Sequence, residues 1–378
     1  MNFSLTEEQK SIQAWAQKIA TELVAPHASR HSAEKLSPQF LKSLSEQGLM
    51  TLLVPEDLGG MGLSAVSFAL VMREVSKACG STGVTLAVSN MIADILVREA
   101  SPYQKETFLK ALVSGESLTA SFCLTENSSG SDASALKTRA LKKAQGYEIT
   151  GEKIYVTNGA FSQFFIVMAR TSDEPGSRGV SAFIVPRDSK GLVLGKEEDK
   201  MGLTGSSTIR MSLENVLVPE RNRIGAEGEG FKVAMRALDG GRISVSSQAI
   251  GIAEAALDYG IRYAKEREAF GKPIADFQAI QWKIADSATA LSAAELLVLQ
   301  AAYLKDAGKP LTLAASQAKV FATEAAIRVC DDMIQILGGY GYIREYPIER
   351  YYRDVRVTAL YEGTSEIQRK VIARELLK

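Results

Sequence analysis

Apolar positions divide the chain into a helical block, a strand-rich block and a second helical block. Across residues 5–115 apolar residues recur every three or four positions, as Ile12 and Trp15 do, and this spacing predicts helices. Thr6 and Gln9 have the pattern of a capping box, in which each side chain bonds the other residue's backbone N–H. The first helix is therefore expected to begin directly after Thr6.

The middle block, residues 117–219, changes to short runs rich in β-branched and aromatic residues. Ile209, Met211 and Leu213 alternate with polar residues, which is typical of a half-buried strand. Gly151-Glu152 stands between two such runs and suggests a hairpin turn. The predicted strands are Tyr147–Thr150, Lys153–Thr157, Phe164–Ala169, Val180–Pro186 and Ile209–Leu213.

Helical spacing returns after the glycine-rich stretch Gly225–Gly230, with Val245, Ala249 and Ile252 on one stripe. Helices, then strands, then helices predict an α+β fold rather than the alternating βαβ units of a Rossmann core. We expect an N-terminal all-α domain at 1–116, a middle antiparallel β-domain at 117–225 and a C-terminal helical bundle at 226–378.

Composition narrows the class of protein. The 378 residues are 46% apolar and carry 44 basic and 44 acidic side chains, so no electrostatic case for nucleic acid arises. Charged or polar residues interrupt the apolar runs before the roughly 20 positions that a bilayer requires. With no basic leader and three scattered cysteines, we expect a cytoplasmic protein without disulfides, structural zinc or a membrane span.

The scarcity of histidine restricts the possible chemistry. His27 and His31 are the only histidines, and their spacing suits one face of a helix better than a metal site. A carboxylate is therefore the leading candidate for a catalytic base. Gly225–Gly230 lacks the glycine order of a dinucleotide fingerprint, and Phe270–Pro273 lacks the Ser or Thr of a P-loop, so both are predicted to be turns.

Two segments remain as candidate sites. Phe122–Asp132 runs from an apolar strand into a hydroxyl-rich loop, which suits either a flavin or pyrophosphate contact or a plain surface turn. Ser365 and Gln368 have capping-box spacing and place Glu362 in the loop before a helix. A lone loop glutamate is usually solvated, whereas a tight apolar turn would raise its pKa and make it a better base.

Three blocks resemble the acyl-CoA dehydrogenase family, and most closely its short-chain (butyryl-CoA) members. They are Thr125-Glu126 with Gly130–Asp132, Gln335–Gly341 and Tyr361–Arg369, and the resemblance covers essentially the whole chain. The family fold has a helical domain, a β-domain and a four-helix bundle. The resemblance implies FAD-dependent α,β-dehydrogenation of an acyl-CoA, in which Glu362 removes the α-proton and flavin N5 accepts the hydride.

The resemblance also implies roles for particular residues and a homotetramer in which subunits share the FAD. The flavin ring and pyrophosphate would meet Phe122, Leu124, Thr125, Ser131, Tyr155, Val156 and Thr157, with Thr364 and Glu366 near the catalytic turn. A neighbouring subunit's FAD would meet Arg267, Phe270, Gln278, Gln335, Gly338 and Gly339. The acyl-CoA would meet Ser131, Asp239, Arg242, Tyr361 and Gly363.

Some positions depart from the family pattern or leave alternatives open. Gly240 and Gly241 occupy the stretch where some members carry the base, which leaves Glu362 as the candidate. Asn127-Ser128 replaces a usual Pro-Gly pair, and Tyr155 stands where tryptophan is common.

An electron-transferring flavoprotein is the expected electron acceptor. The alternatives are a dehydrogenase of carrier-protein-bound acyl groups and a non-catalytic, flavin-containing DNA-binding relative.

Overall fold

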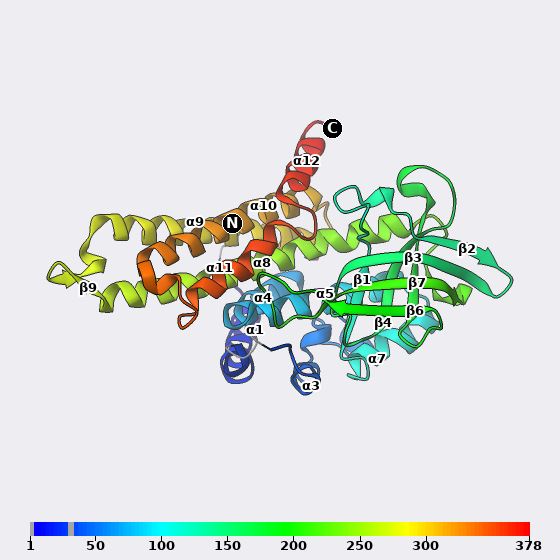
Figure 1. The fold of residues 1–378 in the computed structure, drawn as a ribbon, viewed down its shortest axis with the longest axis horizontal. Helices are drawn as coiled ribbons and strands as arrows, with labels where there is room; N and C mark the ends of the chain where they lie inside the picture. The colour runs from blue at the N-terminus through cyan, green and yellow to red at the C-terminus, as the bar shows by residue number, and fades with distance from the viewer. Residues whose placement is uncertain (1–3, 29–33) are drawn as a thin grey trace.

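The computed structural model describes residues 4–28 and 34–378, so His31 lies outside the described residues. The expected order of helices, strands and helices is confirmed, and the sheet lies at one end of the long axis (Figure 1). The N-terminal helices are α1 (Glu7–Ile19), α2 (Ala25–Ala28), α3 (Pro38–Glu46), α4 (Ala65–Ala78), α5 (Gly80–Glu99), α6 (Pro102–Gln104) and α7 (Lys110–Val113).

Two N-terminal helices show how side chains fix helix starts. The predicted capping box of α1 is present, because Thr6 accepts from the backbone N–H of Gln9 and the Gln9 side chain accepts from that of Thr6. The start of α4 is capped from a distance of 240 residues in sequence. There the carboxylate of Asp306 accepts from the backbone N–H groups of Ala65 at 2.6 Å and Val66 at 3.1 Å.

The middle of the chain forms one eight-stranded sheet in the order β6-β7-β3-β2-β4-β5-β8, with β1 paired to β4. Most neighbours are antiparallel as expected, but β1 and β2 both run parallel to β4. The strands are β1 (Thr119–Cys123), β2 (Arg139–Lys143), β3 (Gly146–Thr157), β4 (Ser162–Arg170), β5 (Val180–Pro186), β6 (Leu192–Glu197), β7 (Thr208–Val218) and β8 (Arg223–Ile224).

The hairpin predicted at Gly151-Glu152 is wrong, because β3 passes through both residues as one strand. The register against β7 shifts between Ile149 and Gly151, which marks an irregularity in the ladder instead of a turn. Gly151 has φ 155°, and a side chain there would meet the backbone of Thr138. A glycine inside a strand can thus indicate close approach of another segment as well as a turn.

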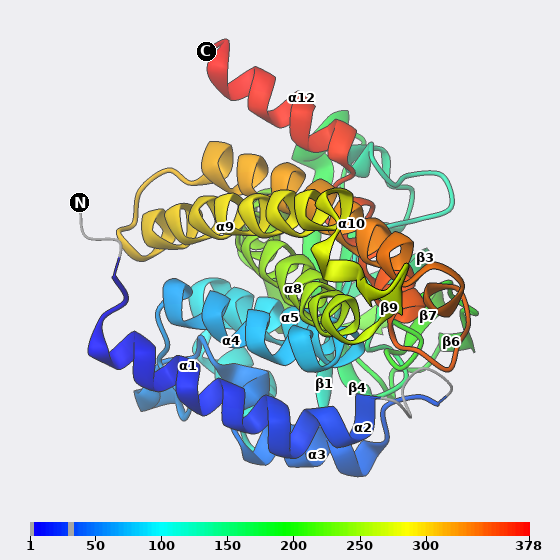
Figure 2. The ribbon, with the colours of Figure 1, turned by 90° about the vertical axis from the view of Figure 1, so that its left-hand side faces the viewer.

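The C-terminal helices are α8 (Gly230–Glu266), α9 (Gln278–Asp306), α10 (Thr312–Leu337), α11 (Ile348–Arg356) and α12 (Ser365–Leu376), with short strands β9 (Glu268–Ala269) and β10 (Lys272–Pro273) between α8 and α9. Figure 2 shows α8 between α4 and α5 on one side and α9 and α10 on the other. Helix α8 therefore belongs to the packing of both helical blocks.

The core explains the long apolar run in β4. Phe164 and Ile166 pack with the N-terminal helices, whereas Phe165 and Val167 pack with residues of the sheet itself. Because both faces of the strand are buried, its sequence is continuously apolar instead of alternating.

Two described helices, α5 and α9, are long and apolar enough to cross a membrane by length and composition, which the sequence analysis did not expect. Most of α5 is buried inside the protein, and buried core helices commonly have this composition.

Candidate active site

A tight turn before α12 presents Glu362. Glu362 has φ 51° and Gly363 has φ 89°, so two successive residues are in the left-handed region, which is unusual for glutamate. The side chain of Gln368 donates to the carbonyls of both residues, at 3.1 and 3.0 Å. Thr364 caps α12 by accepting from the N–H of Ile367, so the cap lies one residue before the predicted Ser365.

The Glu362 carboxylate lies against the backbone of α8. A side-chain carbon placed on Gly241 would come within 1.9 Å of Glu362 Oε2. That oxygen is buried and has no hydrogen-bond partner among residues 4–28 and 34–378. Gly241, which sequence analysis associated with the alternative base position, therefore provides the space that the carboxylate fills.

Burial and nearby cations set the acidity of Glu362. Burial raises the pKa of Glu362 from 4.5 to about 7, although the positive charges of Lys319 and Arg242 oppose the rise. A carboxylate with a pKa near 7 is a stronger base than a solvated glutamate and is still ionised in a large fraction of molecules at neutral pH. The solvated-glutamate interpretation is therefore disfavoured.

Arg242 connects α8 with α10 beside this carboxylate. The buried guanidinium forms an ion pair with Asp239 and donates to the Ser316 hydroxyl at 3.3 Å. Asp239 in turn accepts from the Thr312 hydroxyl at 2.7 Å. Arg242 Nε is buried without a partner, so the guanidinium retains an unused donor. Contact of Asp239 and Arg242 with CoA stays a prediction.

Tyr361 belongs to a second chain of hydrogen bonds. Its hydroxyl donates to the Gln248 side chain, and Gln248 donates to the carbonyl of Gly80 at 2.9 Å. Burial and the negative charge of Glu362 raise the pKa of Tyr361 well above its ordinary value, so this side chain stays neutral. These hydrogen bonds connect the turn that carries Glu362 to α8 and α5.

The structure brings the two predicted flavin segments side by side at the ends of β1 and β3. The Ile154 N–H donates to the carbonyl of Thr125 at 2.9 Å, and the Ser121 hydroxyl donates to the carbonyl of Thr157 at 2.7 Å. Phe122, Leu124, Thr125 and Val156 belong to this region, Tyr155 is 61% exposed, and Ser131 is exposed on the loop after β1.

A buried ion pair shapes the loop that follows β1. Lys153 Nζ lies 2.7 Å from Glu126 Oε1 and donates to the carbonyl of Leu124 at 3.1 Å. The other interactions of Glu126 are with the backbone N–H groups of Lys137 at 2.6 Å and Thr138 at 3.0 Å. Leu124 and Glu126 are therefore held in place from within the domain, whereas Asn127, Ser128 and Gly130–Asp132 are exposed.

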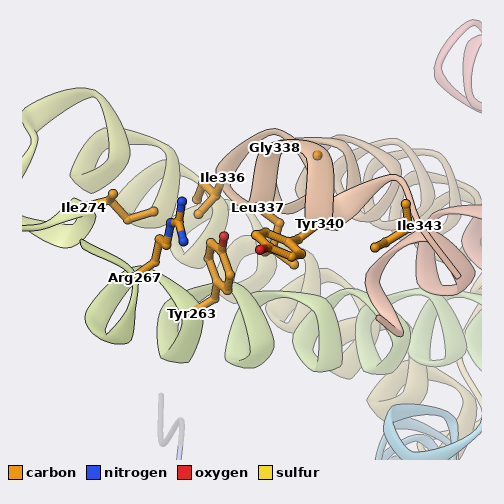
Figure 3. Close-up of a pocket in the computed structure, with 9 residues that line it drawn as sticks. Tyr263, Arg267, Ile274, Ile336, Leu337, Gly338, Tyr340 and Ile343 are labelled. Carbon is orange, nitrogen blue, oxygen red and sulfur yellow. The ribbon is translucent and has the colours of Figure 1, made fainter. Parts of the chain in front are cut away.

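The residues predicted to contact a neighbouring subunit's FAD lie beside β9, at the end of the helices away from the sheet (Figure 1). A cavity of about 410 Å³ opens there between the end of α8 and the end of α10 (Figure 3). Arg267, Gly338 and Gly339 line it together with Tyr340. Added side-chain carbons at Gly338 and Gly339 would meet nothing within 4 Å, so the backbone is open to a ligand. Phe270, Gln278 and Gln335 are exposed nearby on the same end.

The predicted residues thus form three groups in the chain. The substrate group gathers around Glu362, with Asp239, Arg242, Tyr361 and Gly363, while Thr364 and Glu366 begin α12 beside it. The flavin group lies in the sheet. The Arg267 group, beside β9, is at the opposite end of the long axis from the sheet (Figure 1). One chain therefore does not bring the second and third groups together.

Sequence reasoning missed three buried polar residues that hold the site. They are Lys153, Gln248 and Lys319, all fully buried. Gln368, predicted as part of a capping box, instead donates to the carbonyls of Glu362 and Gly363. A signal was present for Lys319, because Ala315, Ala318 and Ala322 surround it at helical spacing on the apolar face of α10. A lysine in such a stripe is buried, and a buried lysine needs a partner.

Three family models match the chain, and all describe acyl-CoA dehydrogenase domains: N-terminal at residues 6–116, middle at 121–216 and C-terminal at 228–377. The mouse mitochondrial short-chain specific acyl-CoA dehydrogenase is 42% identical, with 99% of this chain and 91% of that protein covered. The match covers nearly the full length of both proteins.

Two solved structures are similar over their whole length. Butyryl-CoA dehydrogenase from Megasphaera elsdenii superposes with a TM-score of 0.96 at 39% identity, covering 100% of both chains. A chain in a structure described as the electron-transferring flavoprotein of Acidaminococcus fermentans gives 0.97 at 42% identity, again covering 100% of both chains. The chain therefore belongs to the acyl-CoA dehydrogenase family.

Proposed function

We propose that the chain oxidises short acyl-CoA thioesters to trans-2-enoyl-CoA with FAD, and that Glu362 is the base. The observation that carries the proposal is the Glu362 carboxylate, held in a left-handed turn with one buried oxygen that no group in the described part of the chain binds. A buried, unpaired carboxylate oxygen is costly for folding, so its retention is explained by a ligand. The similarity to short-chain and butyryl-CoA dehydrogenases supports the substrate class.

The residues fit an FAD at two places. Phe122–Thr125 and Tyr155–Thr157 would hold the flavin ring, and Arg267 with Gly338 and Gly339 would hold an adenosine half in the 410 Å³ cavity. When bound, FAD supplies the acceptor for the β-hydride. The open backbone at Gly338 and Gly339 permits the close approach that a large cofactor needs.

The protein's own contribution is proton transfer. Ionised Glu362 accepts the α-proton at Oε2, the oxygen with no partner in the structure. Lys319 and Arg242 limit the pKa of Glu362 to about 7, so the base is available at neutral pH. Asp239 and Thr312 orient Arg242, whose free Nε–H points to a role in binding the substrate.

The first test is an anaerobic panel of thioesters from butyryl-CoA to palmitoyl-CoA, with the same acyl groups on a carrier protein. We expect butyryl-CoA to bleach the flavin absorbance fastest, because similar proteins are named short-chain specific and butyryl-CoA dehydrogenases. Faster bleaching by carrier-bound acyl groups would favour the carrier-protein alternative. A protein that binds FAD but is bleached by no thioester would contradict the proposed function.

We further propose that FAD is shared between subunits of a homotetramer. The flavin segments and the Arg267 cavity lie at opposite ends of one chain, so a second copy is required to place them on one cofactor (Figure 1). Exposed aromatic side chains beside that cavity, Phe270 at 95% and Tyr342 at 86%, are typical of a surface that a partner covers.

This arrangement predicts that FAD content and assembly depend on each other. Arg267→Ala should lower FAD occupancy even though Arg267 is remote from the flavin segments of its own chain. Size-exclusion chromatography with light scattering and flavin absorbance measures both quantities. Lys42→Ala, on the exposed surface of α3, is the control and should change neither. A monomer with one tightly bound FAD per chain would contradict the shared site.

An electron-transferring flavoprotein is the proposed acceptor, in agreement with the flavoprotein structure that contains a similar chain. Tyr155 is exposed at the end of β3, next to the flavin segments, where such a partner would approach.

We propose that the protein is located in the cytoplasm. The DNA-binding alternative has no support from a chain of zero net charge.

A further inference from the structure

We propose that Lys319 is a positioning residue for the reaction: it clamps the Glu362-Gly363 turn and supplies the buried positive charge that faces the Glu362 carboxylate. The inference rests on the proposed function of Glu362 as the base. Lys319 lies on α10, 43 positions before Glu362 in the sequence. It would act on the reaction through Glu362 and would not contact the substrate.

The burial of Lys319 requires an explanation. Lys319 has no exposed surface, and Ala315, Ala318 and Ala322 on the same face of α10 are also fully buried. A lysine side chain ordinarily keeps its ammonium in water, and full burial is rare unless the charge has a partner. An apolar residue would pack better here, so the ammonium must serve an interaction.

That interaction is with the catalytic turn. Lys319 Nζ donates to the Gly363 carbonyl at 2.8 Å. Gln368 donates to the same carbonyl and to that of Glu362, so two buried side chains hold the two left-handed residues. Left-handed backbone is unfavourable for glutamate and persists only where its surroundings enforce it. Lys319 therefore helps fix the direction in which Glu362 projects.

The ammonium also acts on the charge of Glu362. Among the cations that oppose the rise in the pKa of Glu362, Lys319 has the largest effect and Arg242 the second. Burial lowers the pKa of Lys319 to about 8, and the charge of Glu362 opposes that fall. The other charged or titratable groups around Glu362, Lys319 and Arg242 are Asp239 on α8, Glu324 on α10, Tyr361 in the turn, and Glu366 and Arg374 on α12.

Lys319 is one of three regularly spaced polar contacts along α10. Thr312 bonds Asp239, Ser316 bonds Arg242 one turn later, and Lys319 bonds the carbonyl of Gly363 after the next turn. The first two contacts hold side chains of α8, and the third holds the turn before α12. One rigid helix thus sets the positions of the arginine and the glutamate relative to each other.

The test is the pH dependence of flavin reduction in Lys319→Met, which keeps the length of the side chain but removes its charge and donor. In the parent, the rate with butyryl-CoA should rise with pH through about 7, as Glu362 loses its proton. In the Met variant the midpoint should move upward by about one unit or more, because a nearby positive charge no longer favours the ionised base. At pH 7 the rate should fall about fivefold for a shift of one unit, and further for a larger shift, with FAD content unchanged.

Lys319→Arg retains a positive charge and donors, so its midpoint should remain close to that of the parent. Lys309→Met, at an exposed position between α9 and α10, is the control for loss of a lysine and should leave the profile unchanged. A Met variant with the midpoint of the parent would overturn the proposal. If none of the thioesters reduces the flavin of the parent protein, the proposed function fails instead.

A stability measurement covers the case in which Lys319→Met folds poorly. At pH 7.5, where Lys319 and Glu362 are both mostly charged, the variant should lose less thermal stability in a Glu362→Gln background than in the parent, because the unpaired buried carboxylate is then absent. Equal losses in the two backgrounds, or failure to fold in both, would show that Lys319 serves packing alone and would overturn the proposal.

Discussion

Glu362→Gln is expected to bind FAD as the parent does but to reduce its flavin with butyryl-CoA about 10² to 10⁴ times more slowly, the usual effect of removing a general base. Glutamine has nearly the same size as glutamate and fits against Gly241, so the turn should keep its shape. Rapid-mixing absorbance under anaerobic conditions measures the rate. Reduction at close to the parent rate would mean that another group removes the α-proton.

The same variant has a second measurable effect, on stability. Because burial raises the pKa of Glu362 to about 7, the folded protein holds a proton that the unfolded chain releases near pH 4.5. Stability therefore falls as pH rises from about 4.5 to about 7, by as much as about 3 kcal/mol for this shift. The Gln variant should be more heat-stable than the parent at pH 8. Glu46→Gln, on the surface of α3, should change neither rate nor stability.

Lys153→Met is expected to destabilise the protein by about 3 to 5 kcal/mol, the range for removing one partner of a buried ion pair. Glu126 would keep its charge in a buried site with only two backbone N–H donors, from Lys137 and Thr138. Burial alone raises the pKa of Glu126, but Lys153 and these donors together hold it below its ordinary value. For a chain of this size the thermal midpoint should fall by roughly 4 to 6 °C.

This variant should also lose FAD, because Lys153 holds the carbonyl of Leu124 in the predicted flavin segment. Lys143→Met is a matched control, since Lys143 forms a surface ion pair with Glu148 in the same sheet. Surface pairs contribute about 0 to 1 kcal/mol, so its midpoint should barely change. Glu126→Gln combined with Lys153→Met should recover part of the loss. If Lys153→Met alone is as stable as Lys143→Met, the buried ion pair contributes little to stability.

Much of the fold follows from local pattern. Three- and four-residue spacing identified the helical blocks, and alternation identified β7, because each pattern records which face of an element is buried. Gly151 misled the prediction, since the sequence does not distinguish a glycine at a turn from one at a close backbone approach. The cap at Thr364 was placed one residue too late because Ser365 has the same preference for that position.

The candidate site was predicted less completely than the fold. Glu362 was found because a short motif marks it, and the structure gives it the burial that a base requires. Lys153 and Lys319 were not found, because each acts on a residue 27 or 43 positions away in the sequence. Only the tertiary fold brings these charges together.

The cap that Asp306 provides for α4 has a consequence for engineering. Ser64 is the N-cap of α4 and accepts from Ser67, and the Asp306 carboxylate at the end of α9 adds bonds to two further N–H groups, so removing that carboxylate should cost about 1 kcal/mol. Arg73 of α4 makes ion pairs with Glu254 of α8 and Glu295 of α9, which join the same two blocks. The N-terminal helices should therefore melt together with the C-terminal bundle in one calorimetric transition. Chimeras that join an N-terminal block from one relative to a C-terminal block from another should fold only when these partners are transferred as a set.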